Sequence, residues 1–136
     1  MSRSGYSYDC DDWALIRWRG AVDKAILGTR GQHFLHDLRD ALDAMPVKRL
    51  IKDALQQDGE VCALGAVGVK RGIDMSTIDP EERDDVAAAF NIAPALAAEV
   101  ACVNDDDYDW VHESSEQRWQ RVRRWVDDQI PKEMAP

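Results

Sequence analysis

The chain has 136 residues, of which 45% are apolar, and a formal net charge of −9. This length suits one compact core, so we expect residues 1–136 to form a single helical domain with flexible ends at 1–8 and 131–136. The longest apolar run, Val61–Val69, is far shorter than the roughly 20 residues that cross a bilayer, which predicts a cytoplasmic protein without a membrane segment. Three cysteines without a C-x-x-C pair argue against disulfides and structural zinc.

Helices are predicted over most of the chain. The first begins at Asp11 or Asp12 and ends at Gly28, where its helically spaced apolar residues stop. The second runs over about 32–44, and Pro46 prevents it from continuing. Both segments show one apolar face, so both should pack on a core.

Two segments between residues 48 and 72 are compatible with more than one structure. KRLIKDALQQDGE, residues 48–60, favours a helix that ends at Gly59, and a minor β-hairpin near 48–64 is the alternative. VCALGAVGVKRG, residues 61–72, has β-branched residues that suit a strand and small residues that suit a buried helix. We predict a helix there, because Gly65, Ala66 and Gly68 would let a neighbouring element approach closely.

The second half of the chain is predicted to contain three more helices. Asp79, Pro80 and Glu82 combine a cap, a proline suited to the first helical position and a capping-box acid. Ser114 or Ser115 caps the last helix. The three helices are predicted over residues 80–90, 92–103 and 115–130. Six or seven short helices without an internal repeat predict an all-α fold.

The acidic charge is concentrated in one segment. Residues 74–116 contain 13 acidic side chains and 1 basic side chain, a balance of −12. Such a surface repels nucleic acid phosphates and attracts basic partners. Direct binding of nucleic acid is therefore not expected.

Four stretches of the chain resemble known sequences when they are taken together. DDWALIRWRGAV, RGQHFLHDLRDALDAMPVKRLI, DGEVCALGAVGVKRGIDMSTIDPEE and EVACVND resemble a group of small uncharacterised proteins encoded in bacteriophages and prophages, over about Ser4 to Ile130. The resemblance implies a setting in which small accessory proteins bind a host factor, and inhibitors of defence systems such as CRISPR effectors are one such class. It assigns no functional residue, because the activity of the group is not defined.

An acidic stretch before the last helix has the spacing of an EF-hand calcium loop. With Asp105 at the first position, Asp107, Asp109 and Glu116 occupy positions three, five and twelve. Trp110 occupies the sixth position, where the loop needs glycine for its sharp turn. We therefore expect an acidic connection between two helices, and no metal or other cofactor.

The pair of helices around Asn91 has the rhythm of a helix-turn-helix motif. The second helix, 93–103, offers only Glu99 as a polar side chain, without the arginine, lysine or asparagine that reads bases. We predict two core helices that meet at a tight corner.

The polar face of the helix over 32–44 contains His33, His36, Asp37 and Asp40. These are ligand types for a divalent metal, but four ligands from a single helix cannot surround an ion. A solvated face is the favoured interpretation. The alternative is a small metal- or ligand-dependent enzyme that uses this face.

The last helix combines arginine and tryptophan, the residue types that anchor interfaces. Trp119, Val122, Val126 and Ile130 form one inward stripe, so the arginines should mostly face outward. They either neutralise the acidic segment of the same chain or bind a partner. Trp13, off the main stripe of the first helix, is a second interface candidate.

The favoured function is non-catalytic. We expect a small acidic accessory protein that acts in the host cytoplasm by binding a host protein, such as a component of a CRISPR or other nuclease defence system, in one version by mimicking nucleic acid. The predicted partner-binding residues are Asp105, Asp106, Asp107, Asp109, Trp110, Arg118, Arg121 and Arg124. The sequence is also compatible with a homodimer.

Overall fold

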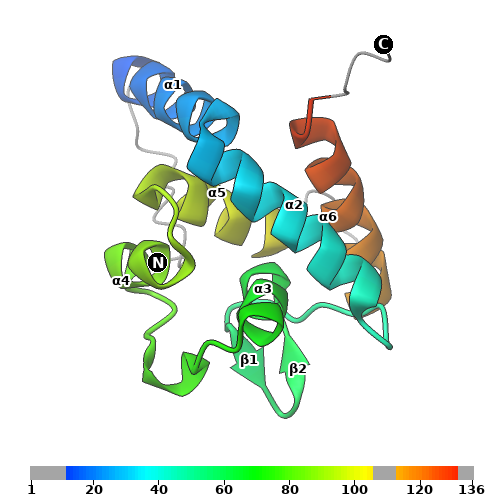
Figure 1. Ribbon diagram of the computed structural model, residues 1–136. Helices are drawn as coiled ribbons and strands as arrows, with labels where there is room; N and C mark the ends of the chain where they lie inside the picture. Colours follow the sequence, from blue (N-terminus) through cyan, green and yellow to red (C-terminus); the bar gives the residue numbers. More distant parts are fainter. Residues whose placement is uncertain (1–11, 106–112, 132–136) are drawn as a thin grey trace.

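The computed structural model describes residues 12–105 and 113–131, which are mainly helical (Figure 1). The helices are α1 (Asp12–Leu27), α2 (Thr29–Ala44), α3 (Ala63–Arg71), α4 (Arg83–Phe90), α5 (Pro94–Asp105) and α6 (Ser115–Gln129). Strands β1 (Gln56–Gln57) and β2 (Glu60–Val61) form an antiparallel hairpin before α3, and the short 3-10 helix η1 (Met75–Thr77) follows α3. The predicted all-α fold with a minor hairpin is confirmed. The ends expected to be flexible, 1–8 and most of 131–136, lie outside the described residues.

Helices α2 and α5 carry most of the packing. α2 contacts α1, α3 and α6, while α5 contacts α1, α3, α4 and α6. Phe34 of α2 meets Phe90 of α4 edge to face, with 6.5 Å between ring centroids. The core is aliphatic around this pair, and its largest fully buried side chains include Leu35, Leu38, Leu42, Leu50, Leu64 and Leu96.

The junction between α1 and α2 is unusually short, because only Gly28 separates the two helices. α2 therefore begins three residues before the predicted start. Gly31 is buried at this junction, and a Cβ atom there would lie 1.9 Å from the carbonyl oxygen of Ala25. Glycine at this position lets the two helix backbones meet.

The helix predicted over residues 48–60 is wrong, and the alternative hairpin is the correct structure. Leu50 and Leu55 are buried, and the N–H of Leu50 donates to Ser115 O at 3.1 Å. Asp58 and Gly59 both have positive φ, as the two-residue loop of a tight hairpin requires. Long-range packing and an Asp-Gly turn therefore outweigh the helical spacing. By contrast, the helix predicted after it is confirmed as α3.

The α4–α5 corner follows the prediction, but both helices begin later than expected, α5 at Pro94 instead of residue 92. The Asp79 carboxylate accepts a hydrogen bond from the N–H of Glu81 at 2.9 Å, and α4 begins only at Arg83, three residues later than expected. Asn91 ends α4 in the left-handed conformation, and the two helices meet at 101°. Among the described residues, no single helix is long and apolar enough to cross a membrane; α4 and α5 reach that threshold only together, across this bend.

Candidate functional site

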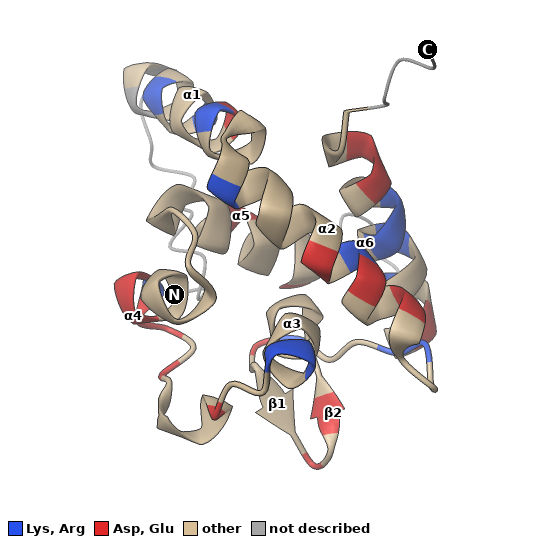
Figure 2. Cartoon of the chain, in the orientation of Figure 1, with Lys and Arg blue, Asp and Glu red and all other residues tan. Residues whose placement is uncertain are grey.

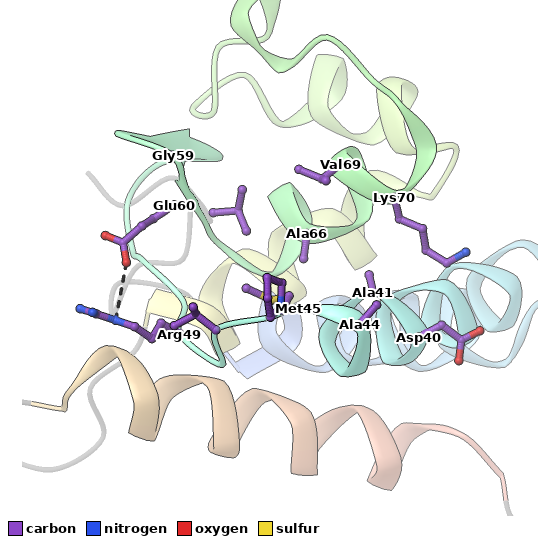
Figure 3. A pocket seen from close by; sticks show the side chains of 13 residues that line it. Asp40, Ala41, Ala44, Met45, Arg49, Gly59, Glu60, Ala66, Val69 and Lys70 are labelled. Carbon is purple, nitrogen blue, oxygen red and sulfur yellow. Dashed lines mark ion pairs between the residues drawn. The ribbon is translucent and has the colours of Figure 1, made fainter.

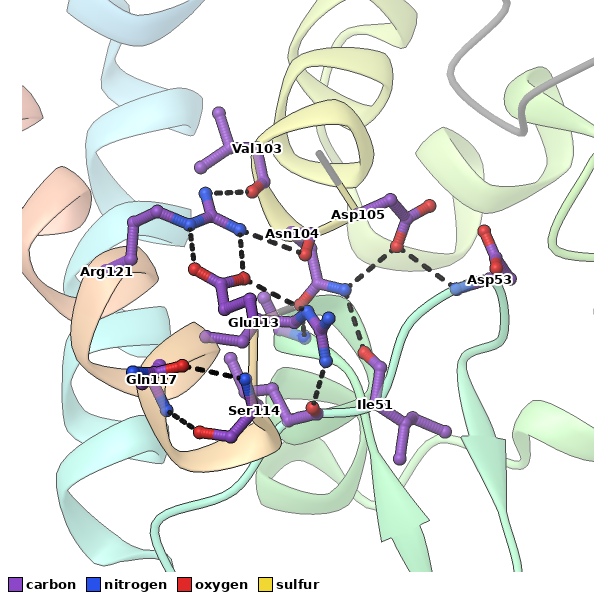
Figure 4. Close-up of polar contacts among 12 residues, drawn as sticks. Ile51, Asp53, Val103, Asn104, Asp105, Glu113, Ser114, Gln117 and Arg121 are labelled. Atoms are coloured by element: carbon purple, nitrogen blue, oxygen red, sulfur yellow. Dashed lines mark hydrogen bonds and ion pairs between the residues drawn. The ribbon is translucent and has the colours of Figure 1, made fainter. Parts of the chain in front are cut away.

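The structure describes half of the eight predicted partner-binding residues. Asp106, Asp107, Asp109 and Trp110 lie outside the described residues. Four others, Asp105, Arg118, Arg121 and Arg124, are described, and three of these join one polar network (Figure 4). Of these four residues only Arg124, on α6, is exposed.

Arg121 connects the last turn of α5 to Glu113, on the two sides of residues 106–112. Its guanidinium binds the Glu113 carboxylate through two contacts, Nε–Oε2 at 2.7 Å and Nη2–Oε1 at 3.0 Å (Figure 4). It also donates to the backbone carbonyls of Val103 and Asn104, in the last turn of α5. A cation that binds the last carbonyls of a helix stabilises that helix end. Arg121 thus has a structural position between α5 and α6.

Arg118 is also internal to the fold. Its side chain donates to Leu50 O at 3.0 Å and lies 3.5 Å from Glu113, and the residue is only 4% exposed. The expectation that the arginines face outward is therefore wrong for Arg118. Arg118 and Arg121 both pair with Glu113, one acidic residue of the segment 74–116 that the arginines were expected to neutralise.

The inward stripe of α6 is confirmed. Val122 and Val126 are buried, and Trp119 and Ile130 pack on the core from partly buried positions. Ser114 caps the helix through a reciprocal capping box with Gln117, as the sequence predicts for this position.

Asn104 is the centre of the polar network, and sequence reasoning missed it. It is 0% exposed, accepts a hydrogen bond from the N–H of Ala63 at 3.0 Å, and donates to Ile51 O at 2.8 Å. Its amide also donates to Asp105, whose carboxylate accepts from the N–H of Asp53. The feature of the sequence that indicates it is a single asparagine directly after the apolar residues of α5. Its role is to hold three chain segments together.

A surface ion pair joins α2 to α6. Arg123 donates to both carboxylate oxygens of Asp43, at 2.8 and 3.1 Å. This hydrogen bonding lowers the pKa of Asp43 below its ordinary value of 3.8. The Asp43 side chain is half exposed, so solvent screening limits the contribution of the pair to less than about 1 kcal/mol.

We expect this pair to give stability a small dependence on acidic pH. Because the folded-state pKa of Asp43 is lowered, the contribution is present above the unfolded-state pKa and is lost as the pH falls through the folded-state value. Urea unfolding of the wild type and of Asp43→Asn, measured across acidic pH, should show a difference that disappears at the lowest pH. A difference that stays constant over the whole range would contradict this assignment.

The polar face of α2 is not arranged as a metal site in the part of the chain that is described. Asp37 pairs with Arg71, with 2.8 Å between Oδ2 and Nη2, and Arg71 also donates to Phe90 O. His33 is exposed. Within residues 12–105 and 113–131, no group of three or more histidine, cysteine or acidic side chains could hold a metal ion. The enzyme alternative stays a prediction without a supporting observation.

An apolar groove opens between α2, α3 and the hairpin (Figure 3). Its volume of about 780 Å³ is within the range of ligand-binding sites. Ala41 and Ala66 are buried in its floor, whereas Val47 and Val69 at its edges are 60% and 64% exposed. The hollow exists because α2 and α3 present small side chains to each other and Pro46 turns the chain away after α2.

Charged residues surround the groove in two pairs. At one end Arg49 lies 3.6 Å from Glu60 (Figure 3). Near the other end Asp40 of α2 and Lys70 of α3 belong to opposite walls. The described lining residues include no histidine, cysteine, serine or threonine. The apolar lining and the charged edges suit the binding of an apolar surface that has charged groups at its sides.

Comparisons with known protein families, with characterised proteins and with solved structures find no match for this chain. The functional argument therefore depends on the geometry of the described residues.

Proposed function

We propose that this chain is a non-catalytic protein-binding module, and that the groove between α2 and α3 receives an amphipathic helix of a partner protein. The observation that carries the proposal is the groove itself, an apolar hollow of about 780 Å³ with exposed valines at its edges. A mostly apolar hollow with a few charged groups at its edges is the usual form of a binding site. In the phage setting implied by the resemblance, the partner is a host protein.

The shape and chemistry of the groove favour a helix as its occupant. Two helices form its walls, and an amphipathic helix laid between them would present apolar side chains at positions i, i+3, i+4 and i+7 to Ala41, Ala66 and Val69. Asp40 and Lys70 would then face the polar edges of that helix. A groove with one acidic and one basic wall selects the direction of the bound helix as well as its apolar face.

Selection from a random peptide library tests this proposal. We expect the wild type to enrich amphipathic helical peptides, and Val69→Lys to lose their binding by about tenfold or more, because a charge replaces an apolar edge that contacts the peptide. Ala88→Lys is the matched control. Ala88 is exposed, and both substitutions place lysine in the last turn of a short helix, where it is tolerated.

Fluorescence polarisation with the enriched peptides measures the effect. Equal binding by wild type and Val69→Lys would contradict the groove as the site. Enrichment of peptides without an apolar helical face would contradict a helix as the occupant.

A nucleic-acid-mimic version of the proposal has one supporting observation. Exposed acidic residues gather just before and within α4, where the ribbon is red in Figure 2. They are Asp79, Glu81, Glu82, Asp84 and Asp85. In this version a basic partner would still bind Val69→Lys, and binding would depend on these carboxylates instead. Asp106, Asp107 and Asp109, which also belong to the predicted partner-binding residues, lie outside the described part of the chain.

A further inference from the structure

Large apolar side chains that remain exposed are confined to two surfaces among the described residues. Val47 and Val69 border the groove, and the remaining exposed residues belong to α1. On α1 these are Trp13, Leu15, Ile16 and Leu27, with exposed fractions of 73%, 52%, 61% and 69%. One surface is a groove and the other is one side of a helix.

The exposed side of α1 has the pattern of a docking helix. With about 100° of rotation for each residue, Trp13, Ile16, Gly20 and Leu27 fall on one face, which we name the α1 stripe. The buried residues Val22 and Ile26 fall on the opposite face, toward the core. Helices that bind in grooves present apolar anchors with this spacing, and tryptophan is the strongest anchor type.

The charges beside the α1 stripe match those beside the groove. Helical geometry places Arg17 and Lys24 along one edge of the stripe and Asp23 along the other. The groove has Asp40 on its α2 wall and Lys70 on its α3 wall. Helix α1 can lie in the groove in two opposite directions. In one of them, Arg17 and Lys24 face Asp40, and Asp23 faces Lys70.

We propose that two copies of this chain form a symmetric dimer in which the α1 stripe of each copy occupies the groove of the other. A two-fold axis makes the two contacts equivalent and closes the assembly at two copies. This inference rests on the proposed function, because it names one occupant of the same groove. It also makes self-association compete with the binding of a partner helix.

Sedimentation velocity over a range of protein concentrations tests the dimer. We expect the wild type and the control Ala88→Lys to double in mass as concentration rises. The stripe variant, Ile16→Lys with Leu27→Lys, and the groove variant, Val69→Lys, should each stay monomeric, with the dissociation constant raised about tenfold or more. Ile16, Leu27 and Val69 are exposed, so these variants should keep the fold, which far-ultraviolet circular dichroism checks.

A mixture of the two variants provides the sharpest test. The groove variant has an intact α1 stripe and the stripe variant has an intact groove, so the mixture should form heterodimers with a single contact, although neither variant associates alone. If the groove variant alone dimerises, α1 pairs with α1 and the proposal is wrong. A wild type that stays monomeric at all concentrations overturns it as well.

The peptide experiment separates this inference from the proposed function. If the wild type is monomeric but binds amphipathic peptides in a manner that depends on Val69, the groove is a binding site and only the dimer is wrong. If the dimer forms, the stripe variant should bind those peptides more tightly than the wild type, because its groove is no longer occupied. Unchanged peptide affinity in the stripe variant, despite wild-type dimers, would place the dimer contact elsewhere.

Discussion

Substitution of Gly65 by alanine is expected to destabilise the fold by about 2–3 kcal/mol, although alanine is the better helix former. Gly65 lies in the first turn of α3, and a Cβ atom there would lie 2.0 Å from the carbonyl oxygen of Leu55. That carbonyl cannot move freely, because it accepts a hydrogen bond from the N–H of Cys62 at 3.2 Å. Alanine would therefore push the segment before the hairpin away from α3.

Gly20→Ala is the matched control for this prediction. Gly20 is also inside a helix, but no atom beyond its two chain neighbours and the adjacent backbone of α1 lies within 4 Å of the position of its Cβ. Alanine there should stabilise the protein by about 0.5–1 kcal/mol, through helix propensity alone. Chemical unfolding at a protein concentration low enough to keep the chain monomeric measures both variants. Stabilisation by Gly65→Ala would show that the approach of Leu55 to α3 is not as close as described.

Substitution of Asn104 by alanine is expected to cost about 3 kcal/mol. The change leaves the N–H of Ala63 and the carbonyl of Ile51 without their side-chain partner inside the protein, and each buried group left unsatisfied costs about 1–3 kcal/mol. Gln120→Ala, at an exposed position of α6, is the control and should have little effect. Urea unfolding monitored by tryptophan fluorescence gives the free energies.

Asn104→Asp separates the hydrogen bonds of Asn104 from its packing. The acid keeps an acceptor for the N–H of Ala63 but, when ionised, places a charge beside Ile51 O and the Asp105 carboxylate. Burial and these neighbours would raise the pKa of the new carboxyl group, so stability should increase as the pH falls through that pKa.

A loss below about 1 kcal/mol for Asn104→Ala would contradict the central role of Asn104 in the network.

The position of Asn104 also bears on function. The network anchors Asp105 and Glu113, the residues on either side of the segment 106–112 that holds four of the predicted partner-binding residues. Asp105, Arg118 and Arg121 are therefore engaged within the fold, and their assignment as partner-binding residues stays an untested prediction. The groove, which lies outside this network, carries the proposed function instead.

Local signals in the sequence were sufficient for the helices and several of their ends. Helical spacing predicted the inward stripe of α6, and Ser114 caps that helix as its residue type indicates. The small side chains in the segment 61–72 predicted the buried helix α3. These features depend on side chains three or four positions apart and on the hydrogen bonds of helix ends, so they are encoded within a few residues.

Only the tertiary structure decided the features that join distant parts of the chain. The non-helical path of residues 48–55, the burial of Arg118 and the role of Asn104 depend on hydrogen bonds between residues 41 to 68 positions apart. The groove likewise requires α2 to meet α3 through small side chains at a particular angle. Periodicity shows which face of a helix is apolar, but it does not show which other segment covers that face. For that reason the sequence predicted the helices, and the packed structure revealed the groove between them.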